Sequence, residues 1–188
     1  MESVDVDIMT HSETLDHWLS PYEKLIGPDF AGYRGHIYRV LNHTLWFLKG
    51  DQRYRAEIEF ALVHHDIGLW TDQDLAYLEP SIAQALKVNE AQGLGFEKDL
   101  IHNLIFYHHK ITAYKGGHAE LVNALRCADW VDASRGKIRH GMERDWIARV
   151  NDAIPAHGFY ETLARVGPEL TGGKKLKMLG KVMQVFKW

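Results

Sequence analysis

The chain has a single cysteine, no long apolar run and no excess of basic residues, and each absence excludes a class of protein. Cys127 is alone among 188 residues, so an intramolecular disulfide and the framework of a small secreted domain are excluded. No stretch approaches the length of a transmembrane helix, about 20 apolar residues. A formal net charge of −3 argues against a dedicated nucleic-acid binder, which normally carries a basic excess.

The first residues also lack the pattern of a secretory signal. Where such a signal has basic residues followed by an apolar run, this chain has Glu2, Asp5, Asp7, Glu13 and Asp16. With the single cysteine, this favours the reducing cytoplasm. The length and the 46% hydrophobic content predict one domain over residues 1–188. A homodimer stays open, because nothing in the sequence specifies an interface.

Hydrophobic residues recur at helical spacing almost throughout, and no stretch alternates apolar and polar residues long enough to build a sheet. The sequence therefore predicts an all-α fold. The capping boxes Thr10-x-x-Glu13 and Ser20-Pro21-x-Glu23 predict two short helices at the start. After a loop over 28–35, further helices are predicted at 36–48, 53–65, 80–93, 96–108 and from about 118 to beyond 129.

Several of these predicted helices carry acidic residues or histidines on apolar faces. His36 begins one apolar helix, the pair His65-Asp66 ends the next, and Asp129 continues the stripe of a later one. Buried polar groups need partners that offset their desolvation. Taken singly, each is more often a cap or a satisfied structural residue. Their combination on three helices instead favours convergence on a metal ion.

The order His36, His65-Asp66, Asp129 resembles the HD-domain superfamily of metal-dependent phosphohydrolases. The resemblance covers roughly residues 30–135. It extends to the supporting motifs His36-x-x-Arg39-Val40, His65-Asp66-Ile67-Gly68, His108-His109-Lys110 and Ala128-Asp129. It implies an HD-like helical bundle in which His36, His65, Asp66 and Asp129 hold one divalent ion between helices.

Two imidazoles and two carboxylates suit Mn, Fe, Co, Ni or Zn. Such an ion would lower the pKa of a bound water, which attacks a phosphoryl group. The expected function is therefore hydrolysis of a small phosphorylated compound, a nucleotide being one candidate. We predict catalytic roles for Asp66 and His109. Of the two adjacent histidines, His109 is preferred over His108 as the residue that faces the cavity, because it precedes Lys110.

A phosphate ester also needs cationic contacts, and three residues are predicted to bind the substrate. Arg39 stands three residues after His36, and Arg126 three residues before Asp129, so that each shares a helix face with a ligand. Lys110 follows the histidine pair and completes the set. The alternatives for these cations are solvated surface positions or, for Arg126, orientation of Asp129.

Departures from the family pattern limit the prediction. Two-metal members have a further histidine after the His-Asp pair, and this chain has none from 67 through 101. One ion is expected, although a second stays open through the candidates His102, His108, His109 and Glu79. Leu69 stands where some related nucleotidases have an acidic glutamate. The alternative functions are an HD-scaffold hydratase or lyase, a two-iron oxygenase, and a ligand-binding domain without catalysis.

The end of the chain has a different character. Residues 172–187 predict a basic amphipathic helix, with its lysines at 174, 175, 177, 181 and 187. We expect its apolar face to dock on the rest of the domain while the lysines stay in water. Binding to an anionic surface or partner is the alternative.

Overall fold

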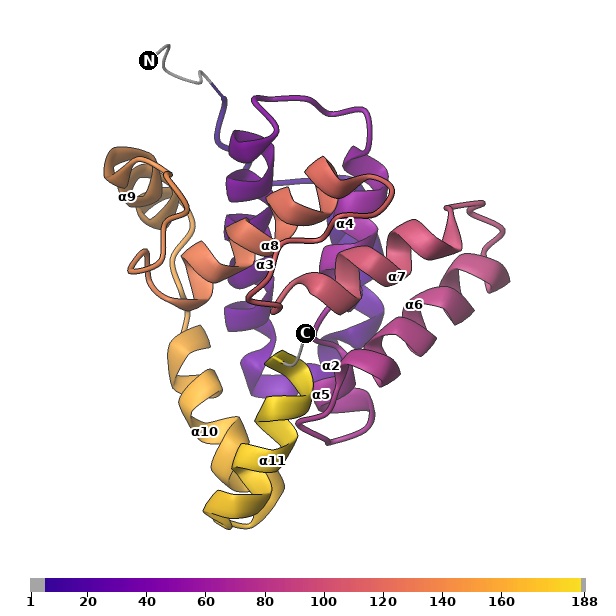
Figure 1. The fold of residues 1–188 in the computed structure, drawn as a ribbon, viewed down its shortest axis with the longest axis vertical. Helices are drawn as coiled ribbons and strands as arrows, with labels where there is room; N and C mark the ends of the chain where they lie inside the picture. The colour runs from indigo at the N-terminus through magenta and orange to yellow at the C-terminus, as the bar shows by residue number, and fades with distance from the viewer. Residues whose placement is uncertain (1–5, 187–188) are drawn as a thin grey trace.

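The computed structural model describes residues 6–186, and within them all regular structure is helical (Figure 1). The predicted all-α fold is confirmed. The helices are α1 (Glu13–Leu19), α2 (Glu23–Ile26), α3 (Phe30–Phe47), α4 (Arg55–His64), α5 (Gly68–Thr71), α6 (Leu78–Ala91), α7 (Lys98–Tyr107), α8 (Ala119–Ala133), α9 (Arg144–Ala153), α10 (Phe159–Thr171) and α11 (Lys175–Phe186). Two short 3₁₀ turns, Ser20–Tyr22 and Gly27–Asp29, flank α2.

Helix α3 runs through the middle of the molecule and organises the core (Figure 1). Every residue from His36 to Leu45 is buried, on all sides of the helix. A helix buried all round must be enclosed by other helices. The most extensive of its contacts is with α8, and α4, α9 and α10 also pack on it. Polar groups on α3 are therefore forced to find partners on these neighbours.

The N-terminal part of α3 differs from the sequence prediction. The segment 28–35 is not a loop, because α3 already begins at Phe30 and continues through Gly32 and Gly35. Glycine is needed here for close packing rather than for a turn. A Cβ atom on Gly35 would lie 2.8 Å from the carbonyl oxygen of Pro155. The first helix also starts later than predicted, since its cap is Ser12, whose Oγ accepts a hydrogen bond from the Leu15 amide, and not Thr10.

Helices α10 and α11 pack on each other at one end of the molecule (Figure 1). With residues after α4 they form a second, smaller apolar cluster that includes Leu69, Tyr77 and Val185. The predicted C-terminal helix therefore docks through one side, and Lys187 lies outside the described residues. The opposite side of α11 keeps its apolar residues in water: Leu176, Leu179 and Met183 are 87%, 56% and 60% exposed.

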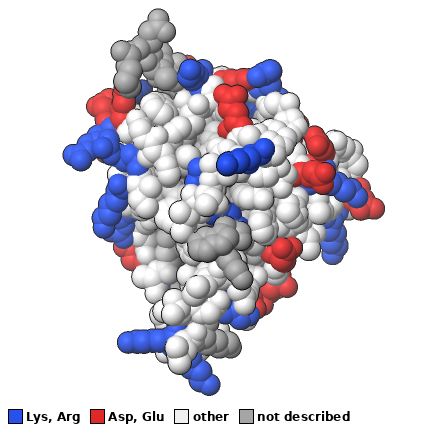
Figure 2. All heavy atoms as spheres, viewed as in Figure 1, with Lys and Arg blue, Asp and Glu red and all other residues white. Residues whose placement is uncertain are grey.

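Charged residues of both signs are spread around the rim of the face shown in Figure 2, with lysine and arginine side chains at the lower end. Within residues 6–186, no helix is both long enough and apolar enough to cross a bilayer.

The turn that follows His65-Asp66 depends on Gly68. Its amide donates a hydrogen bond of 2.9 Å to Ser81 Oγ, which holds the start of α5 against α6. A Cβ atom here would lie 2.5 Å from the backbone oxygen of Tyr77 and 3.0 Å from Ser81 Oγ. The close approach therefore requires glycine, and it fixes the direction in which Asp66 leaves α4.

We expect Gly68→Ala to lower the free energy of unfolding by about 2 kcal/mol, because the added methyl group meets backbone that cannot rotate away. Thermal unfolding followed by circular dichroism measures the effect. Gly180→Ala is the matched control: Gly180 is exposed in α11 with no atom within 4 Å of its Cβ position. That variant should keep or slightly raise the stability. Equal melting temperatures for the two variants would contradict the packing constraint.

Candidate metal centre

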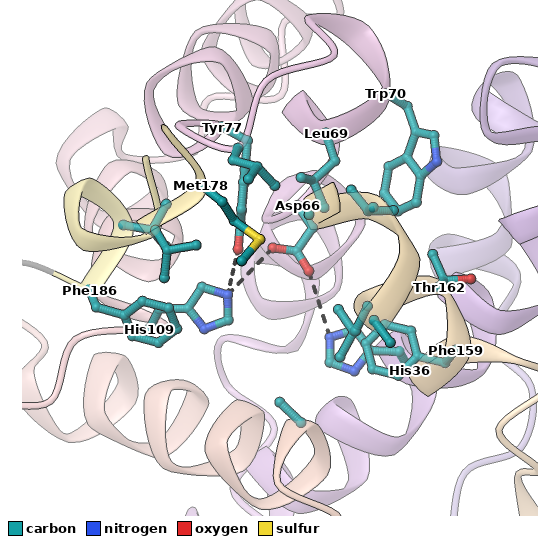
Figure 3. Close-up of a pocket in the computed structure, with 18 of the residues that line it drawn as sticks. His36, Asp66, Leu69, Trp70, Tyr77, His109, Phe159, Thr162, Met178 and Phe186 are labelled. Atoms are coloured by element: carbon teal, nitrogen blue, oxygen red, sulfur yellow. Dashed lines mark hydrogen bonds and ion pairs between the residues drawn. The ribbon is translucent and has the colours of Figure 1, made fainter. Parts of the chain in front are cut away.

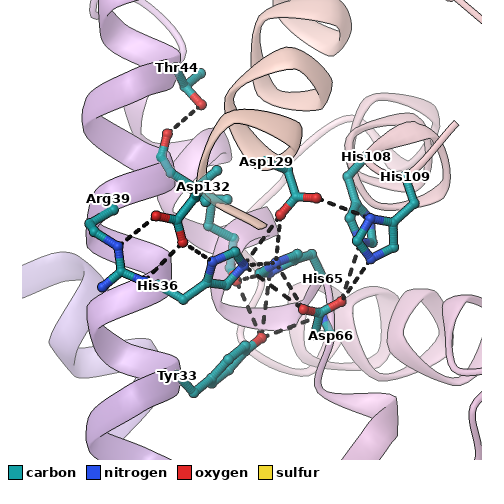
Figure 4. A network of polar contacts seen from close by, with 12 residues as sticks. Tyr33, His36, Arg39, Thr44, His65, Asp66, His108, His109, Asp129 and Asp132 are labelled. Carbon is teal, nitrogen blue, oxygen red and sulfur yellow. Dashed lines mark hydrogen bonds and ion pairs between the residues drawn. The ribbon is translucent and has the colours of Figure 1, made fainter. Parts of the chain in front are cut away.

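The four predicted ligands come together in the middle of the bundle (Figure 4). His36 extends from α3, His65 and Asp66 follow α4, and Asp129 extends from α8. Among the pairs that include His36 or His65, the distances between facing nitrogen and oxygen atoms run from 3.1 Å, between the Nε2 atoms of the two histidines, to 4.0 Å. Atoms bound about 2.1 Å from one ion stand about 3 to 4 Å apart. These pairs therefore have the spacing of ligands that share one ion, and His36, His65 and Asp66 together form a group of the size that a metal requires.

Three histidine rings are held in the same way by their Nδ1 atoms. His36 Nδ1 lies 2.7 Å from Asp132 Oδ2, and the Nδ1 atoms of His65 and His108 lie 2.5 Å from the carbonyl oxygens of Leu62 and Ile105. An acceptor at Nδ1 places the proton on that nitrogen. The Nε2 atom of each ring then faces the carboxylates. Anchoring the second nitrogen in this manner is how proteins orient histidine ligands of metals.

The carboxylate oxygens that face these rings lie 3.0 to 3.3 Å from histidine nitrogens. Within the described residues, Asp66 Oδ1, both Asp129 oxygens and His108 Nε2 are buried and make no hydrogen bond. Buried acceptors of this kind are costly unless a donor or a cation satisfies them. A divalent ion would satisfy several at once, so the donor set fits a metal of the borderline class.

The charge states agree with this fit. Burial alone would raise the pKa of Asp66 and of Asp129, but the neighbouring histidines hold both values well below the usual range, so both carboxylates stay ionised. Burial lowers the pKa of His65 to about 4, so this imidazole stays neutral. Burial also acts to lower the pKa of His36, but its bonds to Asp129 and Asp132 outweigh burial and raise the pKa to about 9. Unlike the other three groups, His36 is therefore protonated while no ion is bound, and an ion at its Nε2 would have to displace that proton.

A second group of ligand type shares Asp66. His108 Nε2 and His109 Nε2 lie 3.2 and 3.9 Å from Asp66 Oδ1, and the three side chains offer atoms within 4.8 Å of one another. Asp66 thus stands between two triads, the first completed by His36 and His65. The candidates for a second ion that the sequence leaves open include His108 and His109, and these two are brought together.

The two adjacent histidines have different surroundings. His108 is fully buried, whereas His109 lines the cavity in front of the site (Figure 3). This placement agrees with the sequence preference for His109. Its Nε2 lies 2.5 Å from the hydroxyl of Tyr77, and its Nδ1 lies 3.0 Å from Asp129 Oδ2. Burial and the charge of Asp66 raise the pKa of Tyr77 well above its usual value, so the hydroxyl keeps its proton.

Asp132 is the site residue that sequence reasoning missed. Its carboxylate accepts two hydrogen bonds from Arg39, of 2.6 and 2.9 Å, and also contacts His36 Nδ1. The signal was available, since Asp132 lies three residues after Asp129 and thus on the same face of α8. Tyr77 was missed as well, because it precedes α6 in a segment without helical periodicity.

The three cations predicted to bind phosphate lie elsewhere, and this corrects the prediction. The Arg39 guanidinium donates hydrogen bonds to Asp132 and to the carbonyl oxygens of Ile154 and Pro155. Lys110 donates from Nζ to a backbone oxygen of α11, and Arg126 donates to Asn123 and to backbone oxygens after α7. None of the three is among the cavity-lining residues. Helical spacing predicts the face of Arg39 and Arg126, but it does not predict the carboxylate, amide and backbone oxygens that accept their hydrogen bonds.

A cavity of about 390 Å³ opens onto the site (Figure 3). His36, Asp66, His109 and Asp129 form its polar end. Residues of α10 and α11 provide much of the remaining wall. Its size is in the range of pockets that bind small molecules, so a small molecule held there would lie beside the site.

We expect Asp132→Asn to weaken metal binding about 10- to 100-fold, because the neutral amide no longer fixes the His36 ring. Competition with a metal-sensitive dye measures the dissociation constant. Arg39→Lys is the matched control, since it weakens the same buried pair but leaves the Asp132 carboxylate on His36. Both variants should melt at lower temperature, and only Asp132→Asn should lose affinity. Equal loss in both would show that Asp132 acts only through stability.

Comparison with known proteins adds no identity. No family model, no curated protein and no solved structure matches this chain. The function is therefore argued from the site itself and from the motif resemblance.

Proposed function

We propose that the protein is a metal-dependent hydrolase that cleaves a small ester with water. The observation that carries the proposal is the buried cluster of Asp66, Asp129 and His108, in which several nitrogen and oxygen atoms of ligand type lie 3 to 4 Å from histidine or carboxylate atoms and make no hydrogen bond within the described residues. A stable fold keeps such a set only where a cation offsets it. The resemblance to the HD-domain superfamily supports a phosphoric ester as the bond that is cleaved.

The residues divide the work of hydrolysis. An ion held by His36, His65, Asp66 and Asp129 would lower the pKa of a bound water and neutralise charge on the ester oxygens. The water oxygen forms the new bond to phosphorus, the ester P–O bond breaks, and one proton must pass from the water to the leaving oxygen. His109 faces the cavity beside Asp66 and shares a hydrogen bond with Tyr77. We assign this proton transfer to His109.

A two-ion centre is the second candidate, and the triad Asp66, His108 and His109 is the observation that favours it. In that arrangement Asp66 is shared by both ions, and His109 becomes a ligand rather than a proton carrier. Two ions support hydrolysis as well as oxygenation by two irons. The number of ions bound per chain separates these possibilities.

Removing the shared carboxylate tests the proposal. We expect Asp66→Ala to lose bound metal and turnover together while the helical content stays largely intact, because the ionised carboxylate reaches both triads. Metal analysis, circular dichroism and a phosphatase screen with each divalent ion give the three readouts. Asp145→Ala, which removes an exposed aspartate from the first turn of α9, is the control and should change none of them. Full hydrolysis by Asp66→Ala at trace metal would refute the mechanism.

Metal stoichiometry provides a separate prediction. With one ion, the purified protein binds one equivalent, and His108→Ala and His109→Ala leave that number unchanged. With two ions, it binds two, and either substitution removes one of them. Mass spectrometry of the native protein counts the ions directly. Two irons per chain would favour the oxygenase and overturn the hydrolase with a single ion.

A further inference from the structure

We propose that the substrate is an apolar small molecule with one compact polar head group, such as a phosphoric ester of an apolar alcohol, and not a nucleotide or a sugar phosphate. This inference rests on the proposed function for the reaction, but the composition of the cavity carries it. Apart from Thr162 and the indole of Trp70, the polar side chains that line the cavity are His36, Asp66, Asp129, His109 and Tyr77. The part of a bound molecule that lies away from these groups would contact apolar side chains.

The wall supplied by the two C-terminal helices is almost entirely apolar. Of the described residues of α10 and α11 that line the cavity, Thr162 alone has a polar side chain. The others include Val166, Met178, Val182 and Val185. Burying a polar body such as ribose against this wall would leave its hydroxyl groups without partners, at a cost for each. Burying a hydrocarbon body there is favourable.

The charges around the cavity point the same way. Among the described lining residues there is no lysine or arginine, whereas two carboxylates, Asp66 and Asp129, line the cavity. Any anionic group therefore depends on the metal for its positive partner. A molecule with one small head group can place that group at the metal, whereas a polyphosphate or a bisphosphate would leave further charges against apolar walls.

Small residues keep the cavity open. Ala133 lines it from α8, and Ala164 and Gly167 line it from α10, at positions where larger side chains would occupy the volume. A Cβ atom on Gly167 would already lie 3.2 Å from the sulfur of Met178. Protein interiors are normally packed to near crystal density, so a large apolar cavity beside reactive groups is a feature with a ligand to explain it.

Two aromatic rings border the polar end and restrict what reaches it. Phe159 stacks on His36 with ring centroids 4.1 Å apart, and Phe186 stacks on His109 at 5.2 Å (Figure 3). The rings cover one side of each imidazole with hydrocarbon. The reactive group of a ligand therefore enters between apolar surfaces, which favours a molecule that is apolar up to its head.

The dissociation constants of n-alkylphosphonates, from methyl to hexyl, test the inference on Zn²⁺-loaded protein by titration calorimetry. We expect affinity to rise about fourfold with each added methylene. Hexylphosphonate should also bind more tightly than adenosine monophosphate. Affinity that is independent of chain length, or tighter binding of the nucleotide, would overturn the proposed substrate class.

Variants locate the binding to the cavity. Val182→Asp places a charge on the wall and should lower the affinity for hexylphosphonate at least tenfold. The neighbouring Met183→Asp, on the 60% exposed outer side of α11, should leave it unchanged. Because Val182→Asp could undock the helix, Ala133→Leu fills the cavity from α8 instead and should shorten the longest chain that still gains affinity. Equal binding by all three variants and the parent protein would overturn the assignment to this cavity.

Metal binding is measured on the same preparation, which separates the two proposals. If Zn²⁺ does not bind, the proposed function fails, and n-alkanols from butanol to octanol on the chelator-treated protein then test the cavity without any metal. An affinity that rises with alkanol length would support the proposed class of apolar substrates. An affinity that does not change with alkanol length would overturn it. If Zn²⁺ binds but the phosphonate series is flat, the metal centre stands and the substrate class fails.

Discussion

One buried carboxylate, that of Asp132, connects the packing of the bundle to the geometry of the metal ligands. It accepts two hydrogen bonds from Arg39 of α3 and contacts the Nδ1 atom of His36 on the same helix. The most extensive helix contact in the molecule, between α3 and α8, is thus formed around an ion pair that is closed to solvent. Loss of either partner would leave a buried charge alone, so α8 cannot slide along α3 without a large cost. The orientation of the His36 ring is therefore fixed by the packing of α3 against α8.

The same burial makes the ligand cluster a source of instability when no cation is bound. Asp66 and Asp129 keep their charges although they are buried, and their oxygens face histidine nitrogens. Metal binding and folding are coupled in such sites, because the bound ion stabilises only the folded chain. The surrounding apolar residues of α3, α4 and α8 hold the cluster in place, and the cluster in turn explains why these helices contain polar residues at all.

The sequence predicted the parts of this arrangement that break a local pattern. His36, Asp66 and Asp129 stand out because each is polar within an apolar helical stripe, and α4 and α8 were placed within a few residues for the same reason. What depends on distant packing was not predictable. Arg39 lies on the expected face of α3, but its partner is 93 residues away. The segment 28–35 is predicted as a loop although α3 begins at Phe30, because glycine signals both a turn and a close contact.

The division of the apolar residues into two clusters has a consequence for how this protein can change. The proposed metal ligands lie on or next to helices of the main cluster, while α10 and α11 contribute to a smaller one. That pair is tied to the rest by few polar contacts, among them the ion pair Arg165–Asp29 and the bond from Lys110 to the backbone of Val185. Substitutions on its inner side can alter the shape of the cavity while the ligands stay fixed. The selectivity of the cavity for a bound molecule and the chemistry of the proposed ligands can therefore evolve at different rates.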